Sequence, residues 1–177
     1  EALVIEETIH QVFQSTASVP GFDVHVLIFD SASKDETALK VTALQAVYPK
    51  LHLRTEPQKT GLGSAYHQAM HAALYELQAD IVAEFDADLS HQPQYLAPML
   101  HKIKNADVVV GSRYVPGGSI PSNWGFRRKL LSKLGNKVAQ LALSHRYKDL
   151  TSGFRLTRRE ALILSLIHIS EPTRPER

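Results

Sequence analysis

Short apolar runs alternate with helix-like segments through residue 112. The runs predict buried strands over residues 25–30, 51–54, 80–86 and 106–112. Before and between them, apolar residues recur at helical spacing over residues 3–15, 35–47, 64–78 and 93–104. Strands that alternate with helices at this spacing form βαβ units. The pattern therefore predicts an α/β fold with a mainly parallel sheet.

The composition fits one globular domain. The chain has 177 residues, of which 44% are hydrophobic and 21% charged, and it contains no cysteine. These values exclude a low-complexity or disordered chain. The lack of cysteine excludes disulfides, thiolate zinc sites and cysteine nucleophiles. No apolar run approaches the roughly 20 residues that a membrane-spanning helix requires.

Charge is divided unevenly along the chain. Residues 1–100 hold 5 Lys and Arg against 13 Asp and Glu, whereas residues 101–177 hold 15 against 5. An acidic and a basic region indicate different partners. The basic region is suited to nucleic acid, to a membrane surface or to a phosphate-bearing substrate.

Polar residues follow the predicted strands directly, at Asp30, at the pair Asp86 and Asp88, and at Arg113. Ligands of open α/β sheets bind at the carboxyl ends of the strands. Two close carboxylates repel unless a cation joins them, and Mg²⁺ or Mn²⁺ binds one or two carboxylates together with phosphate oxygens. The pair thus indicates a metal that binds a diphosphate. The alternative is a solvated turn that caps the helix at Pro93.

The loop from Lys59 to Gly63 leads into a predicted helix and resembles a phosphate loop, because amides at a helix N-terminus attract anions. It matches neither standard nucleotide fingerprint, since Tyr66 stands where the dinucleotide motif needs its third glycine. A tight turn that serves packing is the alternative.

Arginines are the phosphate ligands expected in the basic region, because a guanidinium binds phosphate oxygens with two donors. Arg113 follows a strand, whereas Arg127 and Arg128 belong to a predicted helix from about Trp124 to Ser144. Along this helix apolar and basic residues alternate, which fits a helix lying in an anionic membrane interface. Packing on the domain core fits equally well.

Several of these residues belong to six short motifs: Asp30 with residues 33–37, residues 61–66, 86–91 and 111–114, Trp124 with residues 127–129, and residues 151–155. In this order the motifs resemble those of the dolichol-phosphate mannosyltransferases, family 2 glycosyltransferases of the Rossmann-like GT-A fold. The resemblance covers residues 1–163. Six motifs in order are far more specific than any one of them.

The resemblance implies transfer of a sugar from a nucleotide-sugar to a polyprenyl or dolichyl phosphate, with inversion and with Mg²⁺ or Mn²⁺. GDP-mannose is the donor in the namesake enzymes. By position, Asp30 contacts the nucleotide, Asp88 is the main metal ligand, and Asp86 supports the sugar and the metal. Ser90, where some relatives have a glutamine ligand, completes the expected metal site. Ser31 replaces a carboxylate of the family motif, so a UDP-sugar donor, with glucose or N-acetylglucosamine, stays open.

On the acceptor side, the resemblance implies that Arg113, Arg128 and Ser132 hold the lipid phosphate and that Arg155 organises the phosphate-binding side. A phosphate monoester is largely ionised near neutral pH, so no strong general base is required. The acidic pair and Arg113 are therefore the expected catalytic residues.

The nucleotide-sugar site is expected to include Lys59, Gly61 and Gly63. Glu1 matches the last residue of the family's Pro-x-Tyr-Asn-Glu motif and is assigned to the same site. In this alignment the first strand of the sheet is missing.

The chain is therefore expected to be a partial GT-A domain over residues 1–163, with an amphipathic basic helix over residues 122–146 at the membrane interface. Residues 164–177 resemble a translated sequencing adapter. We expect a peripheral protein at the cytoplasmic face of a membrane, and low stability and no activity for the 177 residues in isolation.

Two rival interpretations remain. A non-catalytic phosphate- or membrane-binding module would use the basic helix alone. Nucleic-acid binding is weaker, because the helix lacks a recognised DNA- or RNA-binding context. The expected partners are a nucleotide-sugar, a polyprenyl phosphate and a membrane surface, without nucleic acid.

Overall fold

A computed structural model describes the backbone of most of the chain. It covers residues 2–116, 118, 125–142, 148–149 and 151–170, without the side chains of residues 128, 129 and 167–170. Three residues singled out above are affected. Glu1 and Trp124, with the side chain of Arg128, lie outside the described residues.

Two of the predicted strands form a parallel pair. Strand β1 (Val26–Ser31) pairs with β2 (Leu51–Glu56) residue by residue from the first to the last. The connection between them carries helix α2 (Thr37–Gln45), so this part of the chain is a βαβ unit. The pairing brings the carboxyl ends of both strands to the same edge.

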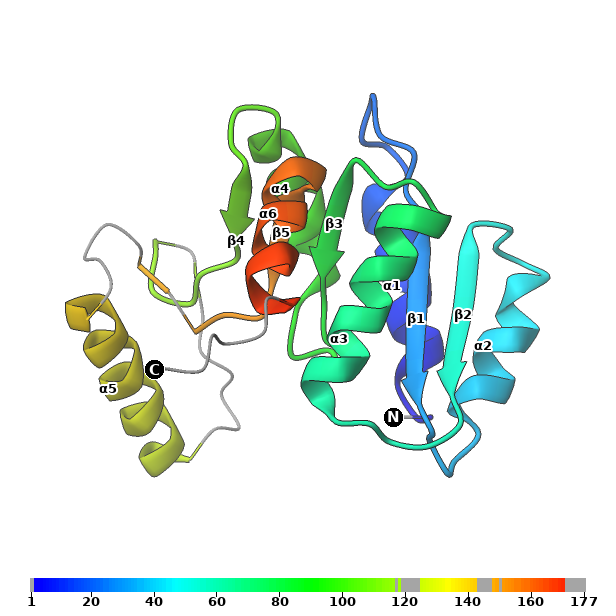
Figure 1. The fold of residues 1–177 in the computed structure, drawn as a ribbon, viewed down its shortest axis with the longest axis horizontal. Helices are drawn as coiled ribbons and strands as arrows, with labels where there is room; N and C mark the ends of the chain where they lie inside the picture. The colour runs from blue at the N-terminus through cyan, green and yellow to red at the C-terminus, as the bar shows by residue number, and fades with distance from the viewer. Residues whose placement is uncertain (1, 117, 119–124, 143–147, 150, 171–177) are drawn as a thin grey trace, which may run out of the picture.

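The other strands form a second sheet in the order β3 (Ile81–Glu84), β5 (Arg155–Arg158), β4 (Val108–Val110). In Figure 1 the arrows of β1 to β4 point the same way, as the predicted mainly parallel arrangement requires. Strand β5 is antiparallel to both of its neighbours and was not predicted from the sequence. The α/β class is confirmed, with an inserted antiparallel strand.

The two sheets are joined by side chains and not by a strand pair. Within the described residues, β1 and β3 make no hydrogen-bonded ladder with each other. Val26 of β1 packs against both of the larger apolar clusters, one built around Ile5, Ile9 and Val41 and the other around Ile103 and Leu156.

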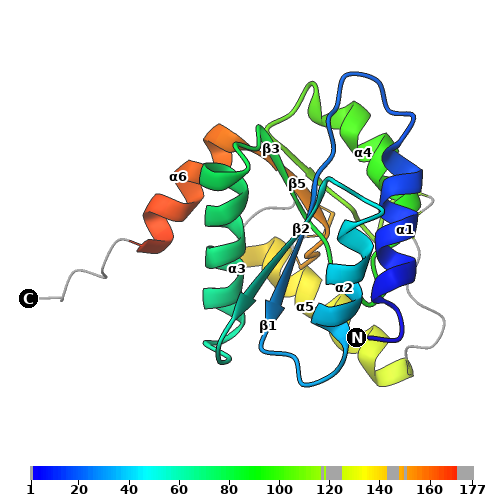
Figure 2. The ribbon, with the colours of Figure 1, turned by 90° about the vertical axis from the view of Figure 1, so that its right-hand side faces the viewer.

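Helices cover both faces of the sheets (Figure 2). On one face lie α1 (Ile5–Thr16), α2 and α4 (Leu96–Ile103), and on the other lie α3 (Leu62–His71) and α6 (Arg159–Ser170). A π-helical turn, η1 (Ala72–Glu76), extends α3, and a 3₁₀ turn, η2 (Pro93–Tyr95), precedes α4. The helices predicted over 64–78 and 93–104 are therefore present.

Two C-terminal helices complete the described chain. Helix α5 (Phe126–Ala142) falls within the predicted basic helix and lies beyond β4, to the side of the sheets (Figure 1). Helix α6 continues past residue 164, and Leu166 packs against the cluster of Met70, Leu74 and Leu162.

Candidate active site

The acidic pair lies on the turn after β3, which we call the acidic turn (residues 86–91). Asp86 and Asp88 are both exposed. The Ser90 N–H donates to Oδ1 of Asp88 over 2.8 Å, and Leu89 has a left-handed φ of 61°. Burial alone would raise the pKa of Asp88, but hydrogen bonds from Ser90 outweigh it and the pKa is lowered. The carboxylate is therefore ionised at neutral pH.

The donor set of this turn suits a divalent cation. It offers two exposed carboxylates and the Ser90 hydroxyl within five residues of sequence. Among the described residues, no three His, Asp or Glu side chains gather closely enough to hold a metal unaided. Mg²⁺ commonly binds through one or two carboxylates and completes its shell with water and substrate phosphates. The residues present fit that mode of binding.

His91, at the end of the acidic turn, received no role from sequence reasoning. The Asp86 N–H donates to Nδ1 of its ring over 2.9 Å. The ring stacks on Phe154, with centroids 5.1 Å apart. Burial lowers the pKa of His91, which favours the neutral ring. Its membership in the acidic motif was the only sequence signal that could have marked it.

Asp30 and Ser31 close β1 at the same edge of the molecule. Asp30 is buried, and its Oδ2 accepts the Ser33 N–H over 3.2 Å. The Ser31 hydroxyl donates to Glu56, the buried last residue of β2. A carboxylate is thus present beside Ser31 although the motif lacks one there. Sequence reasoning missed Glu56, because only the strand pairing brings it next to Ser31.

Glu56 also holds the glycine loop. Its carboxylate accepts the Thr60 hydroxyl over 2.6 Å and the Gln68 side-chain amide over 3.3 Å. Hydrogen bonds from Ser31 and Thr60 lower the pKa of Glu56. Gly61, with a φ of 101°, is the residue directly before α3, while a Cβ on Gly63 would meet no atom within 4 Å. Close packing around its Cα therefore does not explain Gly63.

Arg113 is bound to a buried carboxylate. Its Nε donates to Oδ2 of Asp149 over 3.0 Å and its Nη2 to Oδ1 over 3.2 Å. The Asp149 side chain is 0% exposed, whereas that of Arg113 is 23% exposed. Asp149 raises the pKa of Arg113. Burial alone would raise the pKa of Asp149, but hydrogen bonds from Arg113 outweigh it and the pKa is lowered.

The segment around this ion pair is tightly linked to β4, and we call it the arginine corner (residues 111–113, 149 and 151–155). Nη2 of Arg113 also donates to the Thr151 hydroxyl over 3.0 Å. The Ser152 hydroxyl donates to the Gly111 carbonyl over 2.7 Å, and the Gly111 N–H donates to the Phe154 carbonyl over 2.8 Å. A Cβ on Gly111 would lie 2.8 Å from Cδ1 of Phe154, so only glycine fits there.

Arg155 lies opposite Glu84 in the β3–β5 ladder. Its Nη2 donates to Oε2 of Glu84 over 2.8 Å, and its Nε bonds the other carboxylate oxygen. Glu84 is buried and precedes the acidic turn by two residues. This pair places a guanidinium beside the acidic side of the site.

Helix α5 turns its polar side toward the protein. Ser132 and Tyr114 have hydroxyls 2.8 Å apart, and buried Asn136 donates to the Lys148 carbonyl over 2.7 Å. The apolar side chains of the helix are exposed: Phe126, Leu130, Leu131, Leu134, Val138 and Leu141. Packing on the core through this apolar face, one of the two predicted alternatives, is therefore wrong.

A model of glycosyl transferase family 2 matches residues 1–164. The chain belongs to glycosyltransferase family 2. The α/β architecture agrees with the GT-A fold expected from the motifs.

Curated relatives of this family 2 glycosyltransferase have related names. An undecaprenyl-phosphate mannosyltransferase of Micrococcus luteus is 38% identical over 82% of the chain, and a polyprenol monophosphomannose synthase of Mycolicibacterium smegmatis is 38% identical over 78%. A dolichol-phosphate mannosyltransferase of Pyrococcus furiosus is 35% identical over 82%. The alignments cover 58%, 52% and 40% of these relatives, so the chain spans about half their length.

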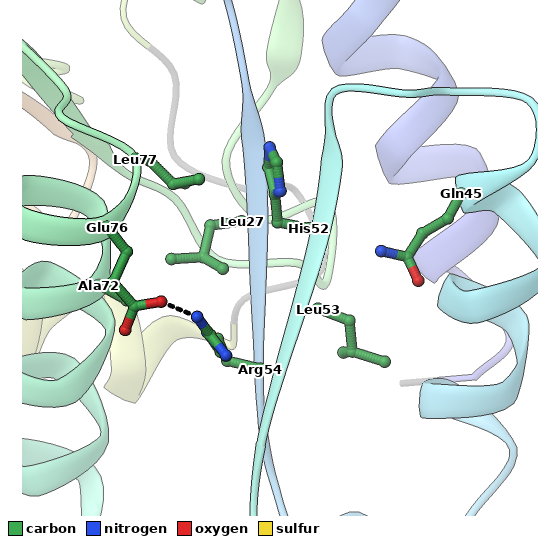
Figure 3. A pocket seen from close by; sticks show the side chains of 8 residues that line it. All are labelled: Leu27, Gln45, His52, Leu53, Arg54, Ala72, Glu76 and Leu77. Carbon is green, nitrogen blue, oxygen red and sulfur yellow. Dashed lines mark ion pairs between the residues drawn. The ribbon is translucent and has the colours of Figure 1, made fainter.

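A small pocket of about 120 Å³ lies away from the predicted site residues of the glycosyltransferase (Figure 3). Leu27 of β1, His52 and Arg54 of β2 and Ala72 of η1 contribute to its lining. An ion pair between Arg54 and Glu76 crosses it. None of the predicted site residues lines this pocket, and we assign it no part in the site.

The structure brings part of the predicted glycosyltransferase site together. The stacked rings of His91 and Phe154 join the acidic turn to the arginine corner. Tyr66 of α3, the helix that follows the glycine loop, donates its hydroxyl to Oδ1 of Asp86 over 3.3 Å, while Asp30 belongs to the neighbouring sheet. Ser132 reaches the site through Tyr114, the neighbour of Arg113. No helix among the described residues has the length and apolar character needed to cross a membrane.

Proposed function

We propose that this family 2 glycosyltransferase transfers mannose from GDP-mannose to a polyprenyl phosphate, with inversion and with Mg²⁺ or Mn²⁺. The observation that carries the proposal is the exposed acidic turn, joined through stacked rings to the arginine corner. The three relatives, each at least 35% identical and named for lipid-phosphate mannose chemistry, support the same reaction.

On the donor side, Asp88 would hold the cation, with Asp86 and Ser90 beside it. A bound cation supplies positive charge to the leaving diphosphate. Asp30 would orient the nucleoside, and the backbone amides at the start of α3 would face the diphosphate. The order of the turn before ligand binding reduces the reorganisation required in the transition state.

On the acceptor side, the phosphate monoester is already largely ionised and acts as the nucleophile without a general base. Its oxygen would attack the anomeric carbon from the face opposite the leaving GDP, which inverts that carbon. Arg113, held by Asp149, and Arg155, held by Glu84, would align the phosphate for this attack. Arg128 and Ser132 are proposed to complete the acceptor site from helix α5.

Helix α5 supports a place at a membrane surface, and we propose the cytoplasmic face. Its apolar residues point away from the protein, and exposed Arg127, Lys133 and Lys137 accompany them. An interfacial helix buries such a face at the acyl boundary while its cations contact anionic headgroups.

A donor panel tests the reaction. The full-length protein is incubated with polyprenyl phosphate, Mn²⁺ and radiolabelled GDP-mannose, UDP-glucose or UDP-N-acetylglucosamine, and lipid-linked sugar is counted. We expect product from GDP-mannose. Product from a UDP-sugar alone would replace the donor assignment, and no product from any donor would favour a non-catalytic phosphate- or membrane-binding module.

Vesicle binding tests the helix. Replacing Leu130 and Leu134 together by Gln is expected to weaken binding to anionic vesicles about tenfold or more, because both side chains lose apolar burial. Leu39→Gln, which changes an exposed leucine of α2, is the matched control and should bind like the unchanged protein. Equal binding by all three proteins would contradict the membrane assignment.

A further inference from the structure

The His91 ring occupies an aromatic cage between two parts of the chain. Its side chain is only 16% exposed. It stacks on Phe154 at an interplanar angle of 16° and forms a T-shaped pair with Phe85 at a centroid distance of 5.7 Å. Phe85 and Phe154 also contact each other edge to face. These contacts fix the plane of the imidazole before any ligand binds.

The hydrogen bond to this ring defines its tautomer. Because the Asp86 N–H donates to Nδ1, that nitrogen carries a lone pair and the neutral ring has its proton on Nε2. Nε2 lies 3.5 Å from Oδ2 of the same aspartate. The ring therefore contacts the backbone and the carboxylate of Asp86 together.

The same bond closes the acidic turn. Asp86 is bound at its amide by His91, and Asp88 is bound at its carboxylate by the Ser90 N–H. Leu89, between Asp88 and Ser90, takes the left-handed conformation that lets the chain reverse there. If the ring acceptor is removed, water alone is left to bind the Asp86 amide, and the turn loses its closing contact.

Phe154 connects this closure to the arginine corner. Its carbonyl accepts the Gly111 N–H, and Gly111 precedes Arg113 by two residues. A ring that rests on Phe154 therefore places the acidic turn relative to Arg113. The His91 ring accepts a hydrogen bond from the Asp86 N–H and packs on Phe154. Substitutions at position 91 can remove either contact while keeping the other.

We infer that His91 is a positioning residue, which accepts the Asp86 N–H on a ring fixed by Phe154 and so sets the carboxylates of the acidic turn for a divalent cation. This inference rests on the proposed function. A residue that orients a metal ligand typically changes metal affinity by 10- to 100-fold when it is lost. If His91 only filled space, its substitution would change the stability of the protein and leave the affinity for the divalent cation unchanged.

Two substitutions separate the interpretations. His91→Phe keeps the stacking surface and removes the acceptor, whereas His91→Asn keeps an acceptor oxygen near the position of Nδ1 and removes most of the ring. Positioning predicts that Mn²⁺ affinity falls in the order unchanged protein, His91→Asn, His91→Phe. Space filling predicts equal affinities, with the lower melting temperature in His91→Asn.

The experiment measures Mn²⁺ binding to the full-length protein by electron paramagnetic resonance, without substrates, alongside thermal melts. We expect His91→Phe to lose at least about tenfold in affinity, with a melting temperature no lower than that of His91→Asn. Equal affinities in the three proteins, or weaker binding by His91→Asn than by His91→Phe, would overturn the role of His91. No Mn²⁺ binding by the unchanged protein would instead overturn the metal assignment of the proposed function.

Nitrogen NMR of the imidazole supplies a readout that does not depend on metal. The unchanged protein is expected to show an unprotonated Nδ1 and a protonated Nε2 at neutral pH. The opposite tautomer would remove the acceptor and with it the inference, even if Mn²⁺ binds.

Discussion

The acidic turn and the arginine corner hold opposite charges in different ways. Asp86 and Asp88 are exposed, and the bonds that order their turn come from backbone amides and neutral side chains. Arg113 is bound by a fully buried carboxylate, and Arg155 by a nearly buried one. The acidic turn thus leaves its charge to be met by a ligand, whereas the arginine corner meets its own charge within the fold.

Because of this difference, removing a charge should have different effects in the two regions. Removing a charge from the acidic turn should affect ligand binding far more than stability, because both carboxylates are exposed and an amide oxygen can still accept the bonds from the Ser90 N–H and the Tyr66 hydroxyl. Removing a charge from the arginine corner should affect stability first, because it leaves a buried partner behind.

The largest expected effect is on turnover. We expect Asp88→Asn to reduce the proposed mannosyl transfer by at least about 10²-fold, the size seen when one preorganised electrostatic group is lost, without changing the melting temperature. Radiolabelled transfer to polyprenyl phosphate measures it. Asp107→Asn, an exposed aspartate before β4, is the control and should be fully active. Full activity in Asp88→Asn would contradict the metal assignment.

Next is the stability of the arginine corner. Arg113→Ala leaves the Asp149 carboxylate buried without its main partner. We expect it to lower the free energy of unfolding by about 3 kcal/mol, the low end for a broken buried ion pair, because the Arg113 side chain is itself 23% exposed. Urea unfolding measures the change. Arg127→Ala, on exposed α5, should stay within about 0.5 kcal/mol of the unchanged protein. If both variants unfold alike, the ion pair between Arg113 and Asp149 does not stabilise the fold as described.

Low pH should reduce the stability that the Asp149 carboxylate contributes. The pKa of Asp149 is lowered in the folded chain, so its contribution is complete above the ordinary value of 3.8 and is lost as the pH falls through the folded value. The difference in unfolding free energy between the unchanged protein and Asp149→Asn should therefore shrink as the pH falls below 3.8. Urea unfolding from neutral pH to below that value measures it. A constant difference would contradict the assignment.

The smallest effect concerns the weakest proposed ligand. Some relatives have glutamine where Ser90 stands, and Ser90→Gln keeps the backbone N–H that binds Asp88. We expect Mn²⁺ affinity to rise about two- to fivefold, less than 1 kcal/mol, by the same resonance measurement. An unchanged affinity would remove position 90 from the proposed ligands.

Local pattern was sufficient for most of the fold. The strands β1 to β4 and the helices between them lie where hydrophobic periodicity places them. Strand β5 was missed because Arg155–Arg158 is short and charged at both ends, and its strand character depends on pairing with β3 and β4. The sequence left open whether α5 packs on the core or lies at a membrane, because only the structure shows that its polar side, with Ser132 and Asn136, contacts the protein.

The sequence predicted which residues lie at the candidate site, but not the side chains that bind them. Asp86, Asp88 and Arg113 were marked by their place after strands, which holds in the structure. Glu56 and Asp149 were missed, since the site residues that they bind, Ser31 and Arg113, lie 25 and 36 positions away in the sequence. His91 belongs to the motif of residues 86–91, but its proposed role depends on its contact with the ring of Phe154.

The close contact between Gly111 and Phe154 predicts which substitutions abolish function. Gly111 contacts no proposed substrate, yet a methyl group there would collide with the ring of Phe154, on which His91 rests. Even a change to alanine would thus be transmitted through two aromatic rings to the acidic turn. A screen for loss of function should therefore recover substitutions at this glycine together with those at the carboxylates.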